Sequence, residues 1–216
     1  MSLKNKKILI TAGPTWVPID KVRVISNIAT GKTGILLANQ AISLGAKVTL
    51  IIGPIGEINN LSKSVKIRQF FYFDQLDKLI KQELKEKKYD IVIHSAAVSD
   101  YKPKNFFYDK ISSDIKNLSL DLESTVKIAD KIKKYSSEIF LVIFKLELGI
   151  TKNQMIERAR KTMLEASADL AVANTISKGK YIAYIINKDK IFGTFKNKEN
   201  LANGLLKLIR KEYARA

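Results

Sequence analysis

Two loops carry the residues whose types and spacing could do chemistry, and each follows a short apolar strand pattern. The first strand, residues 8–11, is followed by a turn that contains Gly13 and Thr15, and a helix pattern begins after Gly31 and Lys32. Because a helix N-terminus offers free backbone N–H groups and a positive dipole end, this arrangement predicts an anion site. The glycine spacing matches neither a Walker A loop nor a GxGxxG fingerprint, so an ordinary first βα unit is an equal alternative.

The segment between these glycines has an unusual composition for a loop. Arg23 and Asn27 are four residues apart, the apolar pair Val24 and Ile25 lies between them, and Asp20 comes just before. A buried apolar pair flanked by polar side chains is uncommon in a solvated loop. We therefore expect this segment to pack against the ligand-binding edge of a sheet.

The second loop follows the apolar run 89–94 and ends at Pro103. Asp100 could orient a sugar hydroxyl or help to hold a metal, and a turn or helix cap is its structural alternative. His94, the single histidine, ends the strand, and a structural role is favoured over that of a catalytic base. The loop opens with small residues that would let a ligand approach the backbone, namely Ser95, Ala96 and Ala97.

Strand and helix patterns alternate along the chain, which predicts an α/β fold: a Rossmann-like, doubly wound, mostly parallel sheet with a C-terminal β-hairpin and a flap. Ligands bind beyond the carboxyl ends of the strands in such sheets, so the two loops are expected to share one cleft. The expected strands are 8–11, 47–52, 65–70, 89–94, 118–122, 139–144 and 169–173, with a hairpin over 181–195. The expected helices are 33–44, 74–87, 123–134, 152–166 and 197–213.

Residues 102–117 form an irregular, polar and aromatic stretch that contains Lys110. Structureless segments of this length inside a compact domain are commonly functional. The stretch therefore predicts a flap or an excursion from the sheet.

The length and composition are those of a single globular domain over residues 1–216. The chain has no cysteine, which excludes disulfides, thiolate metal sites and a cysteine nucleophile, and is compatible with a cytoplasmic protein. It has no run of about 18 apolar residues, so no membrane span is expected. Its first residues lack the apolar core of a signal peptide.

The formal net charge of +17 permits a nucleic-acid-binding interpretation. However, the lysines are scattered over every segment, and no zinc spacing, RNP-type motif or evident helix-turn-helix accompanies them. A solvated lysine-rich surface is the favoured interpretation, and a positive field that attracts a small polyanionic substrate is the next. No nucleic-acid partner is expected.

Three linked motifs resemble those of the phosphopantothenate–cysteine ligases (phosphopantothenoylcysteine synthetases) of coenzyme A biosynthesis. TAGPTWVPIDKVRVISNIATGKTG resembles their opening signature, HSAAVSDYKP their Ala-Ala-Val-x-Asp-Tyr segment, and KISS their flap lysine motif. FKLE followed by ARKTMLEASADLAVAN resembles the stand-alone form found in some bacteria. The motifs occur in the family's order over nearly the whole chain.

The resemblance implies a two-step ligation that uses a nucleotide together with Mg²⁺, and CTP is favoured over ATP as this nucleotide. The carboxylate of 4'-phosphopantothenate attacks the α-phosphate of CTP, which gives an acyl-cytidylate and pyrophosphate; the amine of L-cysteine then displaces CMP. Positive groups near the phosphates would stabilise the charge that develops. The resemblance also implies a homodimer, for which the 181–195 hairpin is a candidate pairing edge. It identifies no metal ligands.

Roles are carried over only where the motifs match. Asn27 would act on the acyl-nucleotide, Arg23 matches the family's arginine, and Lys110 matches the flap lysine at the triphosphate. A loop-capping Asn27 and a solvated Lys110 are the structural alternatives. The implied nucleotide site comprises Gly13, Thr15, the backbone of His94, Ser95 and Ala96, Asp100, Lys110, Phe144 at the base, and Lys161. The implied substrate site comprises Asn27, Ala97, Gly31 and Lys32.

Several positions depart from the family pattern and leave the choice of nucleotide open. Ala29 stands where serine is usual, 123–126 replaces a Lys-x-Pro segment, and FKLE replaces Phe-Ala-Ala-Glu. The family's base-reading lysine falls nearest Thr162, with Lys161 adjacent. The alternative of a different class is a non-catalytic Rossmann-like domain that binds nucleotide or nucleic acid. A dinucleotide-dependent reductase is disfavoured because GxGxxG is missing.

Overall fold

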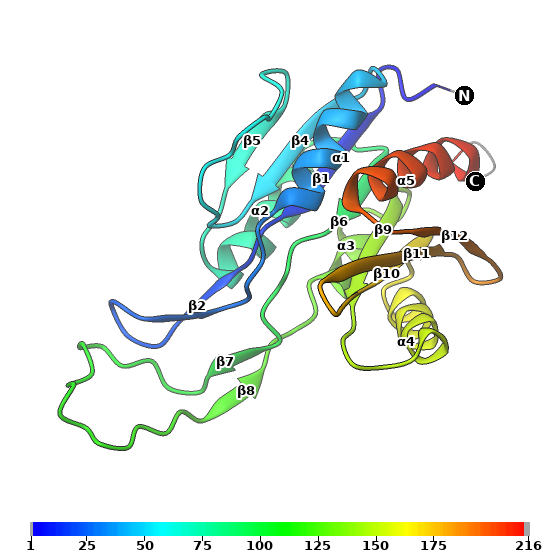
Figure 1. Ribbon diagram of the computed structural model, residues 1–216. Coiled ribbons are helices and arrows are strands. Elements are labelled where there is room, and N and C mark those ends of the chain that lie inside the picture. The colour runs from blue at the N-terminus through cyan, green and yellow to red at the C-terminus, as the bar shows by residue number, and fades with distance from the viewer. Residues whose placement is uncertain (1, 214–216) are drawn as a thin grey trace.

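The computed structural model describes residues 2–213 and contains one eight-stranded sheet (Figure 1). The strand order is β12-β11-β10-β9-β6-β1-β4-β5; all neighbours are parallel except the pairs that involve β11. This confirms the predicted mostly parallel sheet with its C-terminal hairpin. The strands are β1 (Lys7–Ala12), β4 (Lys47–Ile52), β5 (Lys66–Gln69), β6 (Ile91–His94), β9 (Phe140–Leu146), β10 (Leu170–Ser177), β11 (Lys180–Ile186) and β12 (Ile191–Phe195).

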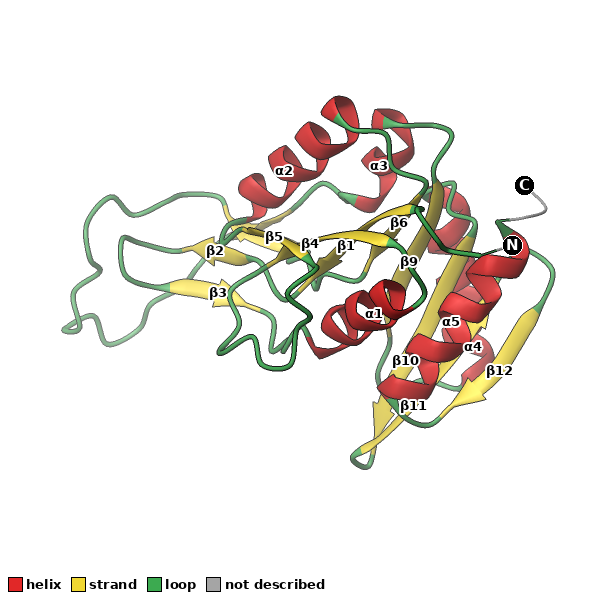
Figure 2. Cartoon of the chain, turned by 90° about the horizontal axis from the view of Figure 1, so that it is seen from above, coloured by secondary structure: helices red, strands yellow, loops and turns green. Residues whose placement is uncertain are grey.

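Helices cover both faces of the sheet (Figure 2). Successive side chains of a strand point to opposite faces, so Ile8 and Ile10 of β1 join one core while Leu9 joins the other. The first core is closed by α1 (Lys32–Ser43) and α5 (Lys198–Glu212). The second is closed by α2 (Phe73–Glu86), α3 (Ala129–Tyr135) and α4 (Lys152–Glu165).

The strand order fixes where a ligand can bind. From β1 the chain first builds outward to β4 and β5, and then returns to place β6, β9 and β10 on the other side of β1. The connections therefore diverge between β1 and β6, which opens a crevice at the carboxyl ends of these two strands. The loops that follow β1 and β6 are the two singled out from the sequence.

Two small antiparallel ribbons project from this edge of the sheet (Figure 1). The first is the hairpin of β2 (Trp16–Pro18) and β3 (Val24–Ser26), and the second pairs β7 (Tyr101–Pro103) with β8 (Leu122–Ser124). We call residues 16–26 together with 101–124 the arm, and residues 104–121 within it the flap. The predicted excursion from the sheet is thus present, and the hairpin 16–26 was not expected.

Three expectations about the arm and its surroundings were wrong. The strand expected at 118–122 lies instead at 122–124, because Glu123 and Ser124 pair with the residues that follow the loop after β6. That pairing also prevents a helix from starting at residue 123, and α3 begins only at Ala129. The pair Val24–Ile25 is not buried as expected: Val24 is exposed and Ile25 is half-buried, because both lie in a two-stranded ribbon with no sheet beneath it.

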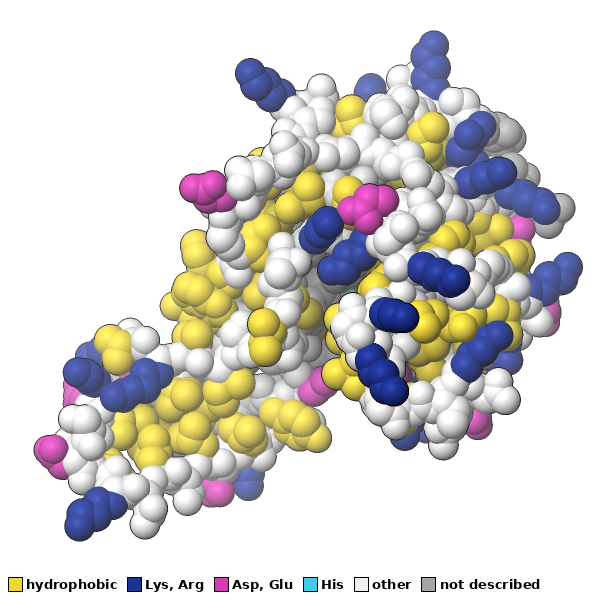
Figure 3. Space-filling view, in the orientation of Figure 1, with side chains coloured by type: hydrophobic (Ala, Val, Ile, Leu, Met, Phe, Trp, Pro, Cys, Tyr) yellow, Lys and Arg dark blue, Asp and Glu magenta, His cyan; other side chains and the backbone are white. Residues whose placement is uncertain are grey.

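The C-terminal hairpin, predicted over 181–195, consists of β11 and β12, which turn at Lys188 and Asp189. Strand β12 lies at one edge of the sheet, and its pairing with a second copy of the chain stays a prediction. None of the helices described over residues 2–213 is long and apolar enough to cross a membrane. Lysine and arginine side chains are dispersed over the face shown in Figure 3, whereas hydrophobic side chains gather on the arm.

Gly34 sets the distance between α1 and β1, and its substitution tests that contact. A Cβ at this position would lie 2.4 Å from the Cβ of Ala12. Alanine is favoured over glycine within a helix by about 1 kcal/mol, but forcing α1 off the strand is expected to cost more. We expect Gly34→Ala to lower the free energy of unfolding by about 1–3 kcal/mol in urea titrations. Gly56→Ala is the matched control, since a Cβ there meets nothing within 4 Å, and an equal loss in both variants would contradict the proposed contact.

Candidate functional site

The loops after β1 and β6 are joined to each other by hydrogen bonds beyond the end of the sheet. The N–H of Ser95 donates to the carbonyl of Thr11 (3.1 Å), and the N–H of Ala97 donates to that of Gly13 (2.9 Å). The N–H of Thr15 donates back to the carbonyl of Ala97 (3.3 Å). The predicted shared cleft therefore has a hydrogen-bonded floor.

Thr11 and His94 organise the start of this floor. The hydroxyl of Thr11 shares a 2.8 Å hydrogen bond with Nδ1 of His94 and accepts the N–H of Ala96. Both side chains are buried, and burial lowers the pKa of His94 to about 4 because the charged imidazolium is disfavoured there. His94 is thus neutral near pH 7, and its contacts fit the structural role preferred from the sequence.

Two buried hydroxyls continue the floor one turn further out. Thr15 is fully buried, and its Oγ1 accepts the N–H of Ser99 (2.9 Å) and lies 3.1 Å from the Ser99 hydroxyl. Thr125 then donates its hydroxyl to the carbonyl of Ser99 (2.7 Å) and its N–H to that of Asp100. Thr15, which was expected at the nucleotide, is buried and supports the loop after β6. The Asp100 side chain, next to Ser99, is exposed.

Asn27 connects the hairpin to the loop after β6. Its Nδ2 donates to the carbonyl oxygens of Ala97 (3.0 Å) and Val98 (3.2 Å). Because both partners are acceptors, the amide nitrogen must face them, which leaves Oδ1 available as an acceptor. The structure thus brings Asn27 and Ala97 together, as expected for one site.

A cavity of about 640 Å³ lies beside Asn27. Its size is within the range typical of small-molecule sites. The departure noted at Ala29 is part of its lining, so the missing serine hydroxyl would have faced this space. The lining residues are Pro14, Trp16, Ser26, Asn27, Ile28, Ala29, Thr30, Phe71 and residues 54–57.

The two glycines expected at the anion site meet next to this cavity. Gly13 and Gly31 both have positive φ, of 77° and 67°, and a Cβ on Gly31 would lie 3.6 Å from the Gly13 nitrogen. Gly31 also caps α1, so the helix N-terminus points at the cleft. Lys32 is turned away to Glu199 at 3.1 Å in a solvent-exposed ion pair.

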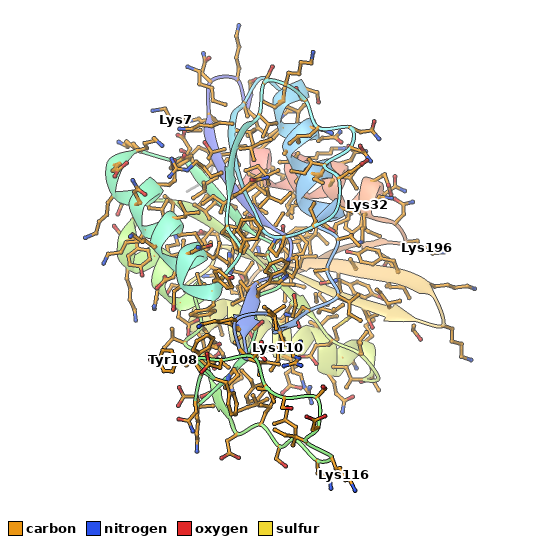
Figure 4. All side chains as sticks on the ribbon, turned by 90° about the vertical axis from the view of Figure 1, so that its left-hand side faces the viewer. Lys7, Lys32, Tyr108, Lys110, Lys116 and Lys196 are labelled. Atoms are coloured by element: carbon orange, nitrogen blue, oxygen red, sulfur yellow. The ribbon has the colours of Figure 1, made fainter. Side chains whose placement is uncertain are left out.

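Arg23 and Lys110 lie in the arm. Arg23 donates from Nη1 to the carboxylate of Asp20 and to the carbonyl of Ile111 (3.1 Å), which ties the hairpin to the flap next to Lys110. Lys110 is exposed and lies on the side of the flap toward the body of the molecule, whereas Lys116 lies at its far end (Figure 4).

The remaining expected nucleotide contacts divide into two groups. Phe144 is half-buried near the carboxyl end of β9, next to β6 and so within the cleft region. Lys161 is exposed on α4, which runs back from the carboxyl edge, and it lies about 14 Å along the helix from Lys152. The N–H groups of Ser95 and Ala96 already donate to Thr11, so a ligand there would meet carbonyl oxygens and small side chains.

Comparison with known proteins places this architecture in a family. Residues 3–213 match the family model described as "DNA/pantothenate metabolism flavoprotein C-terminal domain". The chain belongs to this family.

Two relatives of this chain are named as bifunctional proteins. The chain is 40% identical over 175 residues to the "Coenzyme A biosynthesis bifunctional protein CoaBC" of Thermococcus kodakarensis, covering 81% of this chain and 42% of the relative. It is 37% identical over 198 residues to the protein of the same name from Borreliella burgdorferi, covering 88% and 48%. The chain thus spans about half the length of the curated relatives that it matches.

Solved structures of the family share the fold. The DNA/pantothenate metabolism flavoprotein of Streptococcus pneumoniae matches with a TM-score of 0.85 and 30% identity, over 96% of this chain and 99% of that one. The C-terminal domain of a CoaBC protein matches over the full length of both chains, with a TM-score of 0.81 and 30% identity. A Cab2 variant in complex with phosphopantothenate-cysteine has the same fold at 16% identity (TM-score 0.77; 98% of this chain and 89% of that one).

The loop after β6 presents one exposed carboxylate, that of Asp100, which is suited to share a metal ion with a bound ligand. No group of three or more His, Cys, Asp or Glu side chains suited to a metal is present within residues 2–213. Mg²⁺ at phosphate-transfer sites is commonly held by one or two carboxylates together with substrate phosphates and water. Asp100 could supply one such carboxylate.

Sequence reasoning missed several residues that support or line this candidate site. Thr11 and Thr125 were not singled out, because a threonine in a strand or loop carries no signal until its neighbours in space are known. Trp16 and Phe71 line the cavity with their ring centroids 5.5 Å apart, but 54 positions separate them in the sequence. The positions of Asp20 and Arg23, three residues apart, were the one available signal for the contact with the flap.

The buried His94 makes a testable prediction about pH dependence. Between pH 6.5 and pH 4 the unfolded chain binds a proton at His94 that the folded chain does not, so the free energy of unfolding falls as the pH is lowered through this window. Over the whole window, proton binding at His94 in the unfolded chain lowers the free energy of unfolding by about 3 kcal/mol. We expect His94→Asn, which retains a polar atom near Thr11, to be less sensitive to pH over this window in urea titrations at pH 4, 5, 6 and 7. Identical pH dependence in both proteins would contradict the buried neutral imidazole.

Proposed function

We propose that this chain is a phosphopantothenate–cysteine ligase, which joins 4'-phosphopantothenate and L-cysteine with CTP as co-substrate. The observation that carries the proposal is the Asn27 side chain, hydrogen-bonded to the carbonyls of Ala97 and Val98 at the strand switch point and next to a 640 Å³ cavity. The names of the relatives, and the phosphopantothenate-cysteine bound to a protein of the same fold, support this reaction class.

In the proposed first step, a carboxylate oxygen of 4'-phosphopantothenate attacks the α-phosphorus of CTP. The new bond is an acyl-phosphate bond, the α–β phosphoanhydride breaks, and pyrophosphate leaves. Lys110 neutralises the charge that accumulates on the triphosphate, while the N-terminus of α1 and the Gly13–Gly31 pair offer N–H groups to an anion. A Mg²⁺ ion bound with the triphosphate, with Asp100 as its protein ligand, would supply further positive charge.

In the proposed second step, the amine of L-cysteine attacks the acyl carbonyl carbon, the amide forms and CMP leaves. The Nδ2 of Asn27 is held by two main-chain carbonyls, so its side chain is fixed before the substrate arrives. Oδ1 can then accept a hydrogen bond from the incoming amine and orient it. Arg23, which is bound to Asp20 and Ile111, acts in this proposal by holding the flap.

The test of the function is a pyrophosphate-release assay with 4'-phosphopantothenate, L-cysteine and Mg²⁺, run in parallel with CTP and with ATP. We expect release that requires phosphopantothenate and is faster with CTP, with CMP formation only after cysteine is added. Pyrophosphate release with ATP but not with CTP would show that the co-substrate is ATP. No release with either nucleotide would exclude the ligase and leave the non-catalytic nucleotide-binding domain.

Asn27→Asp tests the division of the reaction into two steps. An ionised carboxylate cannot donate to the carbonyls of Ala97 and Val98, so the side chain loses its fixed orientation. We expect pyrophosphate to be released in a first turnover, while cysteine-dependent CMP release slows by about 100-fold. The matched control is Asn39→Asp, because Asn39 also donates to a main-chain carbonyl but lies on α1 at the loop around Asn60. Normal CMP release by Asn27→Asp would contradict the role given to Asn27.

A further inference from the structure

We propose that Asp20 is a positioning residue whose buried carboxylate latches the flap to the β2–β3 hairpin and thereby holds Lys110 in place. The proposal rests on the proposed function, in which Lys110 acts at the triphosphate. Asp20 is only 2% exposed although it lies in the largely solvent-exposed arm. A buried carboxylate in such a place needs several donors, and the structure shows which groups supply them.

The two oxygens of Asp20 serve two different segments. Oδ1 accepts the N–H groups of Val22 and Arg23, both at 2.8 Å, which closes the turn between β2 and β3. Oδ2 accepts the N–H of Ile111 at 3.1 Å, and the Arg23 guanidinium donates to the same oxygen. One oxygen therefore shapes the hairpin, and the other binds the flap.

Ile111 is the point at which the flap is held. Asp20 takes its N–H, Arg23 donates to its carbonyl at 3.1 Å, and its side chain is 7% exposed between exposed neighbours. Four residues earlier, the N–H of Phe107 donates to the carbonyl of Ile19 at 3.0 Å. Lys110 lies between these two attachments, so its backbone is fixed relative to the hairpin.

The hairpin in turn carries Asn27, which is bonded to the loop after β6. The latch therefore fixes Lys110 and Asn27 relative to each other through one short segment of chain. Holding catalytic side chains in position before the substrate binds contributes to the reaction rate, and a misplacement of about 1 Å can lower that rate about 100-fold.

The charge state of Asp20 suits this role. Burial raises the pKa of its carboxyl, but the backbone N–H groups of Ile111, Val22 and Arg23, together with the Arg23 guanidinium, outweigh that effect and lower the pKa to about 2. The carboxylate is thus ionised throughout the pH range above about 4, where all of its donors can be satisfied. An ionised carboxylate only accepts hydrogen bonds. A replacement side chain that also donates would therefore place its own donor opposite one of these N–H groups.

Asp20→Asn separates the two functions of this side chain. The amide oxygen can still accept the N–H groups of Val22 and Arg23 and keep the turn, but the amide nitrogen then faces the donors of Ile111 and Arg23. We expect amide hydrogen exchange over the flap, residues 104–121, to become at least about 10-fold faster, and phosphopantothenate-dependent pyrophosphate formation to fall about 100-fold. Unchanged exchange in this flap would overturn the latch.

Asp90→Asn is the matched control. The Asp90 carboxylate also accepts a main-chain N–H, that of Lys7, and forms an ion pair with Lys6. However, it lies at the amino end of β6, at the opposite end of the strand from the cleft. We expect its substitution to leave flap exchange and pyrophosphate formation unchanged. Equal effects in both variants would overturn a specific role for Asp20.

A double variant tests whether Asp20 acts through Lys110. Lys110→Gln should reduce pyrophosphate formation by itself, and Asp20→Asn combined with Lys110→Gln should be no slower than Lys110→Gln alone. Additive losses would overturn the link between the two residues. If Lys110→Gln had no effect, the role of Lys110 in the proposed function would fail, and exchange would still show whether the latch exists.

A second variant covers the case in which Asp20→Asn does not fold. Ile111→Pro removes the flap N–H that Oδ2 accepts and leaves Asp20 and the hairpin turn intact. We expect faster exchange over residues 104–110 and the same loss of pyrophosphate formation. Unchanged amide hydrogen exchange in the flap together with unchanged pyrophosphate formation in this variant would overturn the proposal.

Discussion

The hydrogen bonds between the loops after β1 and β6 are the interaction on which the rest of the site depends. Within the sheet these strands are held by a regular parallel ladder that ends at Thr11 and His94. Beyond it, the main-chain bonds of Ser95 and Ala97 and the buried hydroxyls of Thr11 and Thr15 continue the pairing irregularly. Buried polar groups must find partners, and these hydroxyls supply them where a ladder no longer can. The result is a hydrogen-bonded floor that continues directly from the buried ends of β1 and β6.

The arm is held by directional polar contacts more than by a core of its own. Much of its aromatic and aliphatic surface is exposed. Asn27 and Thr125, directly after its two segments, bond to main-chain groups of the loop after β6, and Asp20 joins the two segments to each other. Such bonds contribute modestly to stability, but they restrict geometry strongly. An arm attached in this way can keep its position relative to the cleft while its outer surface stays in contact with solvent.

The elements that the sequence predicted well are those whose own burial decides their structure. The runs 47–52 and 139–144 are apolar because both faces are covered, and α1, α2, α4 and α5 carry clear apolar stripes, so their limits were close to those observed. The strand expected at 118–122 and the early start of the helix expected over 123–134 lie in the arm or directly after it, and Leu118 and Leu122 are exposed there. Alternation of apolar residues there reflects no buried face, and pairing with residues 101–103, far along the chain, set the strand.

The sequence by itself determined the fold class, the two loops of the cleft and most of the candidate residues, because strand and helix periodicity and local motifs are properties of neighbouring residues. Only the tertiary structure decided which candidates meet. It joined Asn27 to Ala97, bonded the buried Thr15 to Ser99 and tied Asp20 to Ile111. These contacts connect positions about 70 to 90 residues apart, and no local pattern encodes them: they follow from the strand order, which is fixed by how the whole chain buries its two cores.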